Sequence, residues 1–134
     1  MNNFKPKIVI FRCDFCAPPG AERIIASKLK DNFRPIMVKT TCTGRIDPTF
    51  ILDAFAKGAD GVMVVGERLG DCHFIRGNYK AMRNIILLKN MLPQLGIDPD
   101  RLKGEWITSD APKFLSSLNE FVDKVTQLGP LGAN

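Results

Sequence analysis

Four cysteines are the residues of this 134-residue chain whose types and spacing could do chemistry. Cys13 and Cys16 form a C-x-x-C pair directly after an apolar run, while Cys42 and Cys72 lie far along the sequence. In a chain without features of secretion, such a pair is typical of a metal or redox site rather than of a structural disulfide. The first question is whether the fold brings the four thiols together.

The pattern of apolar residues predicts four strand–helix units. The strands are expected at residues 7–12, 35–39, 62–65 and 105–108. The helices are expected at residues 21–33, 48–57 and about 74–92, with a last helix from the Ser109–Asp110 cap to Leu128. Asp47 before Pro48 is a strong helix start, because Asp caps the first turn and Pro suits its first position. On the third helix, the predicted buried residues are Tyr79, Met82, Ile85, Ile86 and Leu92.

The alternation of strands and helices predicts one α/β domain over residues 1–134. We expect a four-stranded, mainly parallel sheet with helices on its faces, of flavodoxin- or Rossmann-like topology and with right-handed crossovers. The continuous apolar run at residues 62–65 is typical of a central strand that is covered on both faces.

In such a sheet, the loops after the first three strands meet at one edge, which we call the carboxyl edge. Cys13 and Cys16 follow the first strand, Cys42 follows the second and Cys72 follows the third. This placement favours a four-cysteine metal centre, either an iron–sulfur cluster or zinc. The spacing leaves two alternatives open: a dithiol redox pair at Cys13 and Cys16, and small buried or unrelated thiols.

The residues around the cysteines favour an anionic cluster. Cys72 is expected near a helix N-terminus, where backbone N–H groups and the helix dipole stabilise a thiolate. Arg12, Arg45 and Arg68 lie in or beside the cysteine segments and could offset negative charge. His73, the only histidine, is interpreted as a neighbour of the site or an interface residue rather than as a ligand.

Composition narrows the classes of partner. The formal net charge is +5, but Lys and Arg are spread along the chain without a basic block, so no nucleic-acid partner is predicted. A basic surface suits an acidic protein or an anionic cofactor. No apolar run approaches the roughly 20 residues that span a bilayer, and the start does not resemble a signal peptide. We therefore expect a cytoplasmic protein without a membrane partner.

No catalytic residues are predicted. The sequence contains no recognisable Ser/His/Asp set, glycine-rich phosphate loop or carboxylate pair. Cysteines and prolines also occupy the segment after the first strand, where a flavin-binding fold of this type would need a phosphate-binding loop.

Longer motifs around the cysteines extend over nearly the whole chain. They comprise Cys13-x-x-Cys16, Cys42-Thr43-Gly44-Arg45-Ile46-Asp47-Pro48, Phe55-Ala56-Lys57-Gly58-Ala59-Asp60-Gly61-Val62, Gly70-Asp71-Cys72-His73-Phe74, Gly77-Asn78-Tyr79-Lys80, Glu105-Trp106-Ile107 and Leu128-Gly129-Pro130. By these motifs the chain resembles the delta, or iron–sulfur, subunit of the methyl-viologen-reducing (non-deazaflavin-reducing) hydrogenase of methanogens.

The resemblance implies a non-catalytic electron-transfer subunit with one [2Fe–2S] cluster. In that family the protein passes electrons from a hydrogenase, or in some organisms a formate dehydrogenase, to the flavin-containing A subunit of heterodisulfide reductase. Mapped by motif, the cluster ligands would be Cys13, Cys16, Cys42 and Cys72. Residues 1–134 would then form a single iron–sulfur electron-transfer domain.

One position departs from the family pattern. The family commonly has a further cysteine in a Gly-Cys-His step, where this chain reads Gly66-Glu67-Arg68. The four remaining cysteines are the number that a [2Fe–2S] centre needs, so we expect the cluster to be retained. The substitution at Glu67 could instead mark a paralogue that docks a different electron donor.

Overall fold

The structure is a computed structural model that describes residues 4–13, 29–40, 46–66, 77–106 and 111–131. Its strands are β1 (Lys7–Cys13), β2 (Arg34–Thr40), β3 (Gly61–Gly66) and β4 (Leu102–Trp106). Its helices are α2 (Pro48–Ala56), α3 (Gly77–Met91) and α4 (Ala111–Leu128), with short 3₁₀ turns η2 (Leu92–Leu95) and η3 (Pro99–Arg101). None of these described helices is both long and apolar enough to cross a membrane.

The four strands form one sheet in the order β2-β1-β3-β4, and every pairing is parallel. The predicted α/β fold is therefore confirmed, with a sheet that is parallel throughout. Strands β1 and β3 occupy the centre, and every residue of β3 is buried, as its continuous apolar run predicts. Strand β2, which carries Pro35, lies at one edge, where a missing backbone N–H is tolerated.

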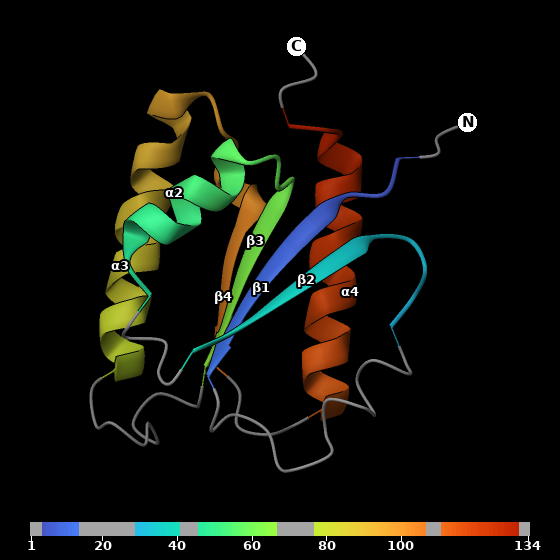
Figure 1. Ribbon diagram of the computed structural model, residues 1–134, viewed down its shortest axis with the longest axis horizontal. Helices are drawn as coiled ribbons and strands as arrows, with labels where there is room; N and C mark the ends of the chain where they lie inside the picture. The colour runs from blue at the N-terminus through green and yellow to red at the C-terminus, as the bar shows by residue number, and fades with distance from the viewer. Residues whose placement is uncertain (1–3, 14–28, 41–45, 67–76, 107–110, 132–134) are drawn as a thin grey trace.

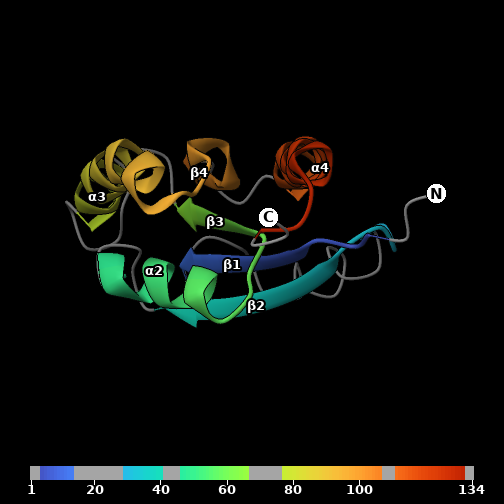
Figure 2. The same cartoon turned by 90° about the horizontal axis from the view of Figure 1, so that it is seen from above.

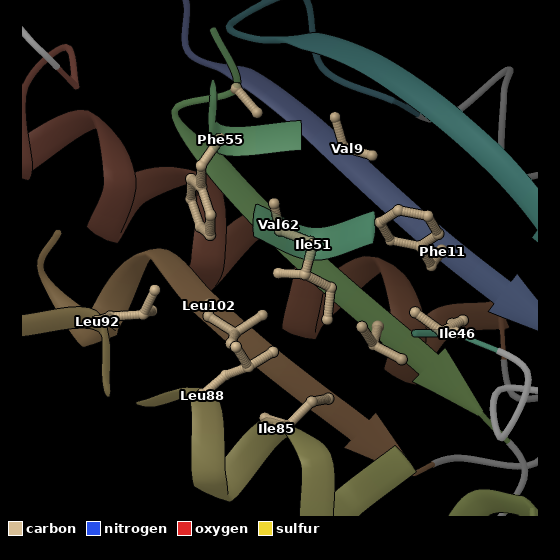
Figure 3. Packing of buried hydrophobic residues seen from close by; sticks show 12 residues of the cluster. Val9, Phe11, Ile46, Ile51, Phe55, Val62, Ile85, Leu88, Leu92 and Leu102 are labelled. Atoms are coloured by element: carbon tan, nitrogen blue, oxygen red, sulfur yellow. The ribbon is translucent and has the colours of Figure 1, made fainter. Parts of the chain in front are cut away.

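Helices cover both faces of the sheet, with α4 on one face and α2 and α3 on the other (Figures 1 and 2). Because successive side chains of a strand point to opposite faces, the strands contribute to two separate cores. The core on the α4 side contains Ile8, Ile10, Phe33, Met63, Val65, Phe114, Leu118, Phe121, Val122 and Val125. The core on the other side is drawn from β1, α2, β3, α3 and β4, and its side chains converge in Figure 3.

A buried carboxylate and a buried guanidinium close the amino edge of the sheet, opposite the carboxyl edge. The carboxylate of Asp60 accepts hydrogen bonds from the backbone N–H groups of Lys7 (2.9 Å) and Leu131 (3.0 Å). Arg101 donates to the backbone carbonyl of Asp60 (2.9 Å) and to that of Gly129 (2.7 Å). The start of β1, the start of β3 and the end of α4 are thus tied to one point.

Asp60→Asn should lower the free energy of unfolding by about 1–3 kcal/mol, although the two side chains have nearly the same shape. An amide offers only one oxygen, so its NH₂ group would face the backbone N–H of Lys7 or Leu131. Urea unfolding at neutral pH measures the change. The exposed Asp100→Asn is the control, with an expected change within about 0.5 kcal/mol. Equal effects of the two variants would contradict the role given to Asp60.

Two predicted boundaries are wrong. The first helix was expected to reach Phe33, but residues 29–33 are not helical. There the chain turns at residues 31–32, Phe33 enters the core, and the backbone N–H of Arg34 already bonds the carbonyl of Pro6 (2.8 Å). The fourth strand was expected from Glu105, yet β4 begins at Leu102, where it pairs with Val62.

The predicted orientation of the third helix is partly wrong as well. Of the residues predicted on the buried side, Ile85 and Leu92 are buried, and Ala81 and Leu88 complete the same stripe with helical spacing. Tyr79 and Ile86, which were predicted on the buried side, are exposed. All four residues from Ile85 to Leu88 are apolar. Four consecutive residues complete about one helical turn, so their side chains point to all sides of the helix. Only part of such a run can face the core.

Candidate metal centre

Three neighbouring strands end level with one another at the carboxyl edge. Cys13 is the last residue of β1 and pairs with Thr40, the last residue of β2. Arg12 pairs with Val65, one residue before the end of β3. The strand arrowheads accordingly meet at the lower end of the molecule in Figure 1. The segments that follow the three strands therefore all leave from the same place.

This edge contains the point where the strand order reverses. The chain runs from β1 to its neighbour β2 and then crosses to β3, on the other side of β1. In open α/β sheets, ligands bind outside the carboxyl ends of the strands at such a switch point. Cys13 ends one of the two strands that border it.

The four-cysteine ligand set stays a prediction. Only the backbone of Cys13 falls within the described residues, and Cys16, Cys42 and Cys72 lie outside them. Arg45, Arg68, His73 and Glu67 lie outside as well. Among the residues that the structure describes, no group of three or more His, Cys, Asp or Glu side chains could hold a metal ion.

Arg12 places a positive charge inside the protein next to Cys13. Arg12 is only 6% exposed, which is unusual because arginine is almost never fully buried unless it is paired. Its register with Ile8, Ile10 and Val65 puts it on the α4 face of the sheet. A buried guanidinium raises the potential around it far more than a solvated one, because little water screens it.

The starts of the helices add to this positive potential. Helices α3 and α4 begin near the carboxyl edge, where their N-terminal N–H groups carry partial positive charge (Figure 1). None of the three described helices has Asp or Glu in its first turn, while Lys80 and Lys113 lie in the first turns of α3 and α4. Positive charge at the carboxyl edge favours negative groups there, such as the Asp47 carboxylate near Lys80 and the thiolates of the predicted ligands.

Ile46, Asp47 and Pro48 fix the far end of the segment that contains Cys42. Ile46 is buried in the core on the α2 side. The Asp47 carboxylate accepts hydrogen bonds from the backbone N–H and the hydroxyl of Thr49, both at 2.8 Å, and so caps α2. The bond from the backbone N–H, the hydroxyl bond and the nearby charge of Lys80 lower the pKa of Asp47 below 3.8. The predicted helix start is confirmed.

Asp47→Ala should lower the melting temperature, because the first turn of α2 loses its cap. A folded-state pKa below the unfolded one means that the ionised carboxylate stabilises the protein fully above pH 3.8. The difference from the wild type should therefore shrink as the pH falls through the folded pKa. Thermal melts from neutral to acid pH measure it, with Asp47→Asn as a control that keeps an acceptor oxygen without the charge. A difference that does not change with pH would contradict this assignment.

Comparison with known proteins adds the family context. Residues 8–129 match the protein family described as methyl-viologen-reducing hydrogenase, delta subunit. The iron-sulfur D subunit of the F420-non-reducing hydrogenase vhc of Methanococcus voltae is 41% identical over 129 residues, which are 96% of this chain and 90% of that protein. The iron-sulfur D subunit of the F420-non-reducing hydrogenase of Archaeoglobus profundus is 42% identical over 95% of this chain and 93% of that protein.

A different kind of relative is much longer. The A subunit of the ferredoxin/F(420)H(2)-dependent CoB-CoM heterodisulfide reductase of Methanosarcina acetivorans is 36% identical over 96% of this chain, but the match is only 16% of that protein. A region similar to this chain is therefore part of a longer polypeptide there.

Proposed function

Because the chain belongs to the delta-subunit family of methyl-viologen-reducing hydrogenase, we propose that it is an electron-transfer subunit with one [2Fe–2S] cluster. It takes electrons from a hydrogenase or a formate dehydrogenase and passes them to the flavin-containing A subunit of heterodisulfide reductase. The observation that carries the proposal is the level ending of β2, β1 and β3, each of which is followed by cysteine.

The proposed ligands are Cys13, Cys16, Cys42 and Cys72. Cys16 follows Cys13 by three residues, Cys42 follows Thr40 by two and Cys72 follows Gly66 by six. A chain reaches at most about 3.6 Å per residue, and neighbouring strands lie about 4.8 Å apart. All four thiols are thus within reach of one point above the end of β1. The departure at Glu67 leaves the full complement of four cysteines.

When bound, the cluster supplies reversible one-electron chemistry, and four thiolates hold it. The chain's own contribution is electrostatic and positional. Arg12 and the starts of α3 and α4 offset the negative charge of the thiolates. The extra negative charge of the reduced state is stabilised by the same groups, so they raise the reduction potential. No residue of the chain is assigned a catalytic role.

The choice of partners follows the relatives. Two of them are named as iron–sulfur subunits of hydrogenases, and another is named as the A subunit of heterodisulfide reductase. Similar regions thus occur as a separate small protein and as part of the reductase polypeptide. This supports direct contact between the separate small protein and the A subunit of heterodisulfide reductase. The proposal also includes formate dehydrogenase as an alternative electron donor, a cytoplasmic location and a single iron–sulfur domain over residues 1–134. These three parts rest on the sequence alone.

Replacement of the cysteines distinguishes the proposal from its alternatives. Cys42→Ser and Cys72→Ser should each remove most of the iron, the sulfide and the visible absorption of anaerobically purified protein, because a [2Fe–2S] centre needs four ligands. Iron, sulfide and zinc analysis with electron paramagnetic resonance of the reduced protein gives the readout. The wild type should contain about two iron and two sulfide per chain.

Two results would contradict the cluster. A colourless wild type with stoichiometric zinc would indicate a structural zinc module. A metal-free protein that keeps thiol–disulfide exchange after loss of Cys42 and Cys72 would indicate a dithiol oxidoreductase that uses Cys13 and Cys16.

Arg12→Met should lower the reduction potential by an amount on the order of tens of millivolts, because a buried positive charge beside the site no longer favours the reduced state. Anaerobic redox titration followed by electron paramagnetic resonance measures the shift. Arg12→Lys should restore most of the potential, and Arg34→Met, exposed at the opposite end of the sheet, should leave it unchanged. A potential that Arg12→Met does not alter would rule out the electrostatic role of Arg12.

A further inference from the structure

The solvent-facing side of α3 combines four apolar or aromatic residues with three polar ones, Lys80, Arg83 and Asn90. Ile86 is 53% exposed and Leu87 is 55% exposed, although both belong to a helix whose other side is packed into the core. We call the exposed apolar side chains of α3 and η2 the α3 outer face. It consists of Tyr79, Ile86, Leu87, Met91 and Leu95.

Helix α4 provides a comparison within the same molecule. It also packs one apolar side against the sheet, with Phe114, Leu118 and Phe121 in the core. Its exposed positions, however, are occupied by Pro112, Lys113, Ser116, Glu120, Asp123, Lys124 and Gln127. A surface helix normally has such a polar outer side, and a helix that is apolar on both sides is normally buried. The exposure of α3 therefore indicates a surface that another protein covers.

The charges on α3 specify the chemistry of that protein. Lys80 and Arg83 are exposed on the helix, and Lys89 lies in its last turn. The helix contains no Asp or Glu over its whole described length, Gly77–Met91. A helix whose exposed apolar residues are interspersed with Lys80 and Arg83 and with no acidic residue fits a partner whose apolar surface carries carboxylates.

The position of α3 suits a docking surface for electron transfer. The helix begins at the carboxyl edge, beside the ends of the strands that precede the cysteines, and runs away from it along the outside of the molecule (Figures 1 and 2). Helix α2 lies on the same face of the sheet and exposes a further aromatic side chain, Phe50. A protein bound here would approach the proposed cluster from the side of α3.

We propose that the α3 outer face docks the A subunit of heterodisulfide reductase. The inference rests on the proposed function and adds the surface through which that function is carried out. The relatives favour this occupant over a second copy of the chain, because in Methanosarcina acetivorans a region 36% identical to this chain is part of the reductase polypeptide itself. A domain that is built into a larger polypeptide has that polypeptide as a neighbour.

The test measures binding between the anaerobically purified chain and the recombinant A subunit of heterodisulfide reductase from the same organism by biolayer interferometry. The double variant Ile86→Asp/Leu87→Asp should weaken binding by about 30-fold or more, since both residues would lie near the centre of the interface. The control Ser116→Asp/Gln127→Asp adds the same two charges to the outer side of α4 and should change binding by less than about twofold.

A milder variant guards against loss of folding. Arg83→Glu exchanges one exposed charge and should weaken binding about tenfold at low salt, with a smaller effect at high salt. For every variant, the melting temperature and iron content should match those of the wild type. Because the reductase, and not a second copy of the chain, is proposed to cover the α3 outer face, the chain alone should be monomeric in sedimentation.

The possible results separate the inference from the proposed function. Wild-type binding that Ile86→Asp/Leu87→Asp and Arg83→Glu leave intact overturns the inference and keeps the proposed partner. A dimer of the chain alone that Ile86→Asp/Leu87→Asp dissociates assigns the face to a second copy and overturns it as well. A wild-type chain that carries its cluster but does not bind the reductase overturns both the docking surface and the proposed partner.

Discussion

The in-register pairing of β1 with both of its neighbours is the constraint on which the rest of the structure depends. It aligns Cys13 with Thr40 and Arg12 with Val65, so that three separate segments of the chain leave the sheet together. A shift of one residue would exchange the two faces of β1 and take Ile8 and Ile10 out of their core. The apolar residues that hold the register therefore also hold the edge where the cluster is proposed, although none of them needs to touch it.

Local patterns could be read from the sequence where one rule dominates. The apolar run of β3, the cap at Asp47 and the regular spacing from Phe114 to Val125 each have one physical interpretation, and the structure agrees with all three. The start of β4 could not be read, because Lys103 and Gly104 of a half-buried edge strand carry no apolar pattern. The end of the first predicted helix was missed because Phe33 belongs to a core made by distant residues.

The candidate site shows a similar division. The cysteine positions predict a site at the carboxyl edge of the sheet, and the parallel topology on which that prediction depends is confirmed. The family match supports the resemblance on which the cofactor was predicted. The sequence could not predict whether Ile86 faces the sheet or the solvent. An apolar helix side has the same sequence pattern whether it packs on its own sheet or on another protein. Burial of Arg12 was equally hidden, because its neighbours in space come from other strands.

The carboxylate of Asp60 has a consequence for how this domain can be joined to others. By bonding both Lys7 and Leu131, it brings the start of the first strand and the third residue after the last helix to one point, at the amino edge of the sheet. The two ends of the described domain therefore lie close together, so the domain can be inserted into a longer polypeptide at a single position. Such an insertion leaves the carboxyl edge and the outside of α3 unobstructed, so one folding unit can serve equally as a free-standing protein or as a module.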